Sequence, residues 1–223
     1  MLIVEELHLL LLRPDGRPEV AAGGYRLYAE IAAAVVDLTL HGRVVLTEEK
    51  RPRVQVVSTE PTGDPVLDDL LVRLAPSSGK HLDSLVVSSK FDPLDQVVAS
   101  LVRQGILARG ERGFFGWGAE RTPESDPGPE MLLRARLAAV LAGTAAPSQA
   151  DLALLAILHG LNAAYPLLRH DLGEMKASQV RTRIEALADG SAAGGAVSGA
   201  VNAAIMVVMM AVMTPVMVAT TMS

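Results

Sequence analysis

The side chains that most often carry chemistry are scattered through this sequence. Its five histidines stand singly, and no two have the four-residue spacing that brings two imidazoles to one metal ion. Ser198 follows Gly195 by three residues, which does not match the Gly-x-Ser-x-Gly turn of serine hydrolases, and the chain has no cysteine. We therefore expect no catalytic residue, no metal site and no cofactor, as in a protein that is not an enzyme.

Two groups of acids come nearest to a cation site. Asp64, Asp68 and Asp69 lie within about one and a half helical turns, and Glu5 and Glu6 are adjacent. Asp64 precedes a proline, which is typical of a helix start, so its carboxylate is expected to cap a helix whose positive end the other two complement. Glu5 and Glu6 are expected to do the same for the first helix while exposed to solvent.

Aromatic rings are scarce, and three of the seven gather in one stretch, at Phe114, Phe115 and Trp117. In a strand, Phe115 and Trp117 share one face and Phe114 takes the other. Core packing of the rings is the simplest interpretation. The alternatives are that one face contacts a partner subunit or enters a bilayer interface, where rings are favoured.

The composition limits the class of protein. The 223 residues carry a net charge of −5, which argues against a nucleic-acid binder because such a protein needs a positive field. Half of the residues are hydrophobic but only 3% are aromatic, so a helical core of Leu, Val, Ala and Met is favoured. The absence of cysteine indicates a reducing, cytoplasmic compartment.

Hydrophobic spacing and turn residues predict a mainly α chain with two small β-hairpins. The helices are expected at residues 2–12, 24–41, 65–74, 93–104, 130–142, 149–168 (interrupted near Pro166) and 173–188. The hairpins are expected at residues 44–57, with a charged loop, and at residues 106–117. Since no long flexible linker separates two cores, residues 1–223 are expected to form a single globular domain.

Residues 190–223 carry no charge and hold six of the nine methionines. Such a segment either crosses a membrane as a tail anchor or lies buried in a core. A spanning helix needs about 20 apolar residues, whereas the longest unbroken run here is Ala203–Met213. We therefore favour a buried core helix, in which methionines fill irregular gaps.

Four stretches resemble, in the same order, the Golgi phosphoprotein 3 family of phosphatidylinositol-4-phosphate effectors. They are Val4-Glu5-Glu6-Leu7, Leu38–Leu46, Pro61-Thr62-Gly63-Asp64 with Leu67-Asp68, and Leu101–Leu107. The resemblance spans nearly the whole chain and suits a bacterial member. It implies a single helical domain with a central apolar helix, here within residues 190–223, surrounded by amphipathic helices, and a projecting hairpin for self-association. It also implies peripheral membrane binding through the phosphatidylinositol-4-phosphate headgroup.

The headgroup residues of that family do not carry over to this sequence. Its tryptophan and first arginine fall near Ala22 and Ile31, and its arginine pair falls at Phe91 and Leu94, so none is tryptophan or basic here. Cations beside an aromatic wall could still hold a phosphate, which predicts weak binding to an anionic lipid. The nearby cations expected to form this substitute site are Arg17, Arg26 and Lys90, and the alternative is that they are solvated surface charges.

These features favour a non-enzymatic, oligomeric adaptor in the cytoplasm that binds an anionic lipid headgroup at the membrane surface and self-associates through residues 106–117. The alternative is an oligomeric protein-interaction or regulatory module that has lost phosphoinositide binding. A winged-helix DNA binder over residues 24–57 is a third interpretation, because Lys50, Arg51 and Arg53 lie in its loop. The acidic net charge and the lack of a basic recognition helix count against it, so no nucleic-acid partner is expected.

Overall fold

The computed structural model describes residues 1–193 of the chain, except 20–23, 48, 50 and 110–120. It is mainly helical, as predicted. The helices are α1 (Ile3–Leu10), α2 (Arg26–Leu40), α3 (Pro65–Leu74), α4 (Leu82–Val86), α5 (Leu94–Arg103), α6 (Gly128–Ala142), α7 (Gln149–Gly160), α8 (Ala164–Leu168) and α9 (Ala177–Ala193). Two turns of 3-10 helix, η2 (Ala75–Ser77) and η3 (Ser89–Phe91), and two strands, β1 (Val44–Leu46) and β2 (Val54–Val56), lie between them.

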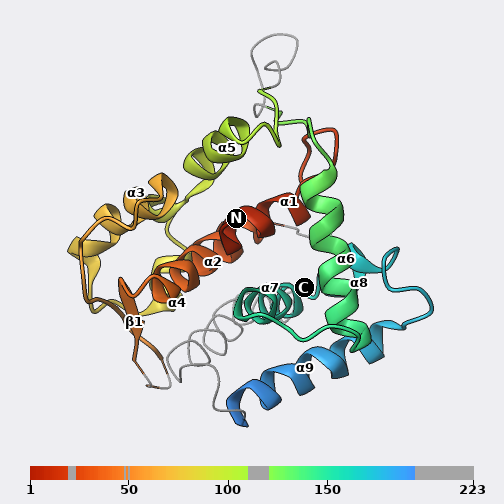
Figure 1. Cartoon of the computed structure of the whole chain (residues 1–223). Coiled ribbons are helices and arrows are strands. Elements are labelled where there is room, and N and C mark those ends of the chain that lie inside the picture. The colour runs from red at the N-terminus through yellow and green to blue at the C-terminus, as the bar shows by residue number, and fades with distance from the viewer. Residues whose placement is uncertain (20–23, 48, 50, 110–120, 194–223) are drawn as a thin grey trace, which may run out of the picture.

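Helices α1 and α2 lie in the middle of the molecule, with α3, α4 and α5 to one side and α6 to α9 to the other (Figure 1). Every residue of α1 is buried, and so is the run Ala29–Thr39 of α2. A helix that is buried on all sides belongs at the centre of a helical core. Within the described residues, α2 lies at this central position. The core helix expected in residues 190–223 falls outside the described residues, beyond the end of α9.

Residues 44–57 form the first predicted hairpin. The antiparallel register places Leu46 opposite Val54, both buried, and the next pair, Val45 and Gln55, faces solvent. This alternation is the pattern of a two-stranded sheet with one face on the core. The loop between the strands carries the predicted charges.

The second predicted hairpin, at residues 106–117, lies largely outside the described residues. Within them, Leu107 forms an isolated antiparallel bridge with Glu124. The described part of the chain therefore holds one small antiparallel sheet, and the pairing expected within residues 106–117 stays a prediction.

The first turn of α3 explains the acids that stand near it. Asp64 accepts a hydrogen bond from the backbone N–H two residues later at 2.8 Å, which confirms the predicted cap. Asp68 accepts from the backbone N–H of Thr62 at 2.6 Å, and Asp69 forms an ion pair with Arg73 one turn later. Each of these carboxylates thus has a structural partner.

The turn after α1 packs directly against residues 122–124. Gly16 in this turn has φ +76°, and a Cβ atom there would lie 2.7 Å from backbone atoms of Thr122 and Pro123. Gly42, after α2, has a similar φ of +66°, but a Cβ atom added there would have no neighbour within 4 Å. The two glycines therefore share a backbone conformation and differ in the space around them.

Replacement of Gly16 by alanine is expected to lower the free energy of unfolding by about 2–4 kcal/mol, against about 1 kcal/mol for Gly42→Ala. Both variants place a side chain in the left-handed region, but only Gly16→Ala also forces the backbone of residues 122–123 to move. Urea unfolding of the two variants and the parent measures the difference. Equal losses at the two positions would contradict the close packing of this turn.

Candidate functional site

Helix α1 buries polar side chains that are predicted from the sequence to lie at the surface. Glu5 and Glu6 are only 2% and 8% exposed, so the prediction that they face solvent is wrong. Burial of a charge is tolerated when the charge is paired and hydrogen-bonded, and both have partners on other helices. Glu5 accepts a hydrogen bond from Gln104 Nε2 at 2.9 Å, and Glu6 Oε2 lies 2.7 Å from Arg136 Nη2. These contacts tie α1 to its neighbours.

A line of hydrogen-bonded polar groups runs from α1 to the surface, and we call it the Arg26 cluster: His8, Glu30, Arg26 and Asp92. His8 Nδ1 lies 2.8 Å from Glu30 Oε1, and Glu30 Oε2 pairs with Arg26, one turn earlier on α2. Arg26 donates two parallel hydrogen bonds to Asp92, from Nη2 to Oδ2 at 2.8 Å and from Nη1 to Oδ1 at 3.1 Å. Glu30 is fully buried, whereas Arg26 and Asp92 are part-exposed, so the cluster reaches solvent at the start of α2.

Lys90 lies in η3, and Asp92 follows in the turn that leads to α5. Arg73 of α3 holds the main chain of this segment, because Arg73 Nη1 donates to the carbonyl oxygens of Lys90 (2.8 Å) and Asp92 (3.1 Å). Lys90 is exposed, with its Nζ 5.3 Å from the centroid of the Phe91 ring. Among the residues that the structure describes, no carboxylate forms an ion pair with Lys90. Its charge is therefore available to an anion.

The start of α2 adds backbone donors to this surface. Within the described residues no side chain caps it, and no acid occupies its first turn. The first N–H groups of a helix lack partners within the helix, and the macrodipole makes this end partly positive. The rings of Tyr25 and Tyr28 lie beside it, with centroids 6.0 Å apart. Backbone N–H donors and a cation are groups that bind a phosphate.

The structure brings together two of the three cations predicted for a headgroup site. Arg26 bonds to Asp92, two residues along the chain from Lys90. Arg17 lies instead in the turn after α1, with its Nε 3.6 Å from Asp15 Oδ2, and no contact joins it to the other two in the described part. Sequence reasoning did not single out Arg73, which holds the turn that presents Lys90. The predicted hairpin residues Phe114, Phe115 and Trp117 lie outside the described residues.

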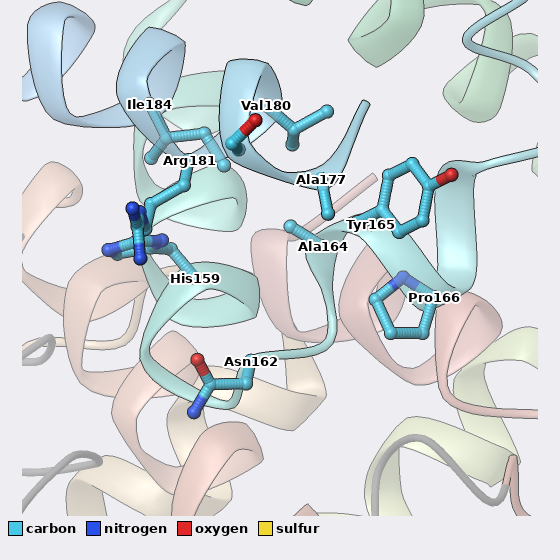
Figure 2. A pocket seen from close by; sticks show the side chains of 10 residues that line it. His159, Asn162, Ala164, Tyr165, Pro166, Ala177, Val180, Arg181 and Ile184 are labelled. Atoms are coloured by element: carbon cyan, nitrogen blue, oxygen red, sulfur yellow. The ribbon is translucent and has the colours of Figure 1, made fainter. Parts of the chain in front are cut away.

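A hollow of about 390 Å³ lies between α7, α8 and α9. Figure 2 shows His159 and Arg181 at one end of it and Tyr165 with Pro166 at the other. Glu185 lies 3.8 Å from His159 and 3.9 Å from Arg181, so its charge offsets that of the arginine. Burial lowers the pKa of His159. A carboxylate lies beside the arginine of this hollow, whereas none pairs with Lys90 in the described part of the chain, so the surface around Lys90 is the better site for an anion.

Membrane crossing requires a long apolar helix. Among the helices of the described residues, none is long and apolar enough to cross a bilayer. The stretch considered as a tail anchor, residues 190–223, lies almost entirely beyond them.

Comparison with known proteins identifies the family. The model of the family described as Golgi phosphoprotein 3 (GPP34) matches residues 3–206. Among curated proteins, no sequence matches the chain significantly. Because the family match covers most of the 223 residues, the chain belongs to the Golgi phosphoprotein 3 family.

Proposed function

We propose that the protein is a non-enzymatic adaptor that binds membranes peripherally through the phosphate of an anionic lipid headgroup. Membership of the Golgi phosphoprotein 3 family supports a lipid-binding adaptor. The observation that carries the proposal is the exposed Lys90, which forms no ion pair in the described part of the chain and lies two residues from Asp92, the partner of Arg26 at the uncapped start of α2. Helix N-terminal N–H groups and a nearby cation act together on a phosphate.

The binding is expected to be weak and sensitive to salt. Lys90 attracts the membrane as a point charge, and such attraction falls off within a Debye length of about 8 Å at physiological ionic strength. Arg26 contributes less than its charge suggests, because two carboxylates already contact it. Self-association through residues 106–117 remains part of the proposal.

The second candidate is an interaction module that has lost lipid binding. It is favoured by the residues that this chain has at the positions of the family's basic residues. Ile31 is fully buried and Phe91 is 3% exposed, so apolar core residues occupy two of these places. This candidate predicts no difference between neutral and anionic vesicles, which separates it from the first.

Lys90→Glu is expected to weaken binding to anionic vesicles by about thirtyfold, since each lysine near an anionic surface contributes about 1 kcal/mol and reversal of its charge doubles the change to about 2 kcal/mol. The measurement is co-sedimentation with phosphatidylcholine vesicles, with and without phosphatidylinositol-4-phosphate, at low and moderate salt. Lys176→Glu makes the same charge change between α8 and α9 and is the matched control. Equal binding by the two variants would reject the site, and a parent that ignores the anionic lipid would reject the function.

A further inference from the structure

Arg26 already binds the carboxylate of Asp92 in the way in which it would bind a headgroup phosphate. Its two parallel bonds to Asp92 have the bidentate geometry in which a guanidinium receives a phosphate or a carboxylate. Glu30 takes a further bond from Nη1. Of the five N–H donors of a guanidinium, these contacts use those of Nη1 and one of Nη2, which form its end-on fork, and none is made by Nε. A phosphate therefore meets an arginine whose end-on fork is occupied.

The charges around Arg26 also oppose a second anion. One guanidinium faces the two carboxylates of Glu30 and Asp92. Burial alone would raise the pKa of Asp92, but hydrogen bonds from Arg26 and from the backbone N–H of Leu94 hold it below its ordinary value. Asp92 is therefore ionised at neutral pH, and its charge repels an anion that approaches Lys90.

The position of Asp92 allows its side chain to change partners without moving the turn. The main chain of the turn is held by Arg73 through carbonyl oxygens, which do not involve the carboxylate. Asp92 Oδ1 also accepts from the Leu94 backbone N–H at 3.0 Å and so helps to begin α5. An amide at this position can keep that last bond through its oxygen while losing the charge.

We propose that Asp92 is an internal competitor for Arg26: its carboxylate occupies the end-on fork, formed by Nη1 and Nη2, that a phosphate monoester would otherwise bind. The Arg26–Asp92 ion pair and full headgroup binding then exclude one another. The inference rests on the proposed function, because the competing ligand is the lipid phosphate. In the parent protein the membrane is held mainly through Lys90, and the fork of Arg26 becomes available only when Asp92 releases it.

Asp92→Asn tests this directly. The variant is expected to bind phosphatidylcholine vesicles that contain phosphatidylinositol-4-phosphate at least about fivefold more tightly than the parent, the low end of typical coupling between two competing contacts. Combining it with Arg26→Lys should remove the gain, because lysine keeps the charge but lacks the fork. Inorganic phosphate, titrated against the same proteins, is the second probe.

Asp95→Asn is the matched control. Asp95 is exposed, lies in the first turn of α5, and forms no ion pair within the described residues, so its substitution removes the same charge without touching Arg26. An equal gain from Asp95→Asn would overturn the competition, as would an unchanged Asp92→Asn variant beside a parent that binds vesicles. If neither the parent nor any variant binds vesicles, a gain for inorganic phosphate in Asp92→Asn would keep the competition but reject the lipid function. No binding of either probe by any variant would reject both.

Discussion

Replacing Glu30 by leucine is expected to lower the free energy of unfolding by about 3–5 kcal/mol, the usual cost of removing one member of a buried ion pair. Glu30 is fully buried and is the shared partner of His8 and Arg26. His8 Nε2 already lacks a hydrogen-bond partner in the described part of the chain, so without Glu30 neither ring nitrogen has one. A domain is stable by about 5–15 kcal/mol, which makes this loss a large share of the total.

The double variant His8→Leu/Glu30→Leu separates the pairing from the packing of this site. It is expected to recover most of the lost stability, because apolar side chains then replace both partners and no buried polar group is orphaned. Arg26 keeps Asp92 in both variants. Urea unfolding of the parent, the two single variants and the double variant completes a double-mutant cycle. A double variant no more stable than Glu30→Leu would contradict the argument.

Many of the helices could be predicted because the residue types at their ends indicate where a helix begins or stops. The pair Asp64 and Pro65 marks the start of α3 at the residue where the helix begins. The interruption expected near Pro166 comes earlier, at Asn162, which has φ +55°. Pro166 lies in the first turn of α8, where its missing N–H leaves no helical bond unmade. Helix α4 has five residues, too few to show a helical period.

The charged contacts of the core could not be predicted in the same way. Glu6 and Arg136 lie 130 residues apart in the sequence, and Arg26 and Asp92 lie 66 apart. Spacing along the chain predicts which residues are neighbours on one helix, but it does not predict contacts between residues that are distant in the sequence. Acids in the first turn of a helix look alike whether they face water or another helix. Asp92 links the segments that carry Arg26 and Lys90, and the headgroup site expected at these cations stays a prediction.

Asp37 is expected to make the folded protein less stable as pH rises. Its side chain, 3% exposed, accepts hydrogen bonds from the backbone N–H groups of Ile3 and Val4, both at 3.0 Å, and so joins α2 to the start of α1. Burial raises the pKa of Asp37 from 3.8 to about 7; the two backbone bonds oppose the rise, and the charges of Glu5 and Glu6 add to it. Between these values the folded state binds more protons than the unfolded chain. The free energy of unfolding should therefore fall across this window, by up to about 1.4 kcal/mol per pH unit.

Asp37→Asn isolates this contribution because an amide does not titrate in the window. The variant is expected to be about 2 kcal/mol less stable than the parent at pH 5, since its amide group turns a buried donor toward an N–H of α1. The gap should narrow toward pH 8, where the parent must hold a buried carboxylate. Urea unfolding of both proteins from pH 5 to pH 8 measures it, with the exposed Asp95→Asn as the control whose offset stays constant. A gap that is independent of pH would show that Asp37 is ionised in the folded protein throughout, held in that state by its two bonds to the start of α1.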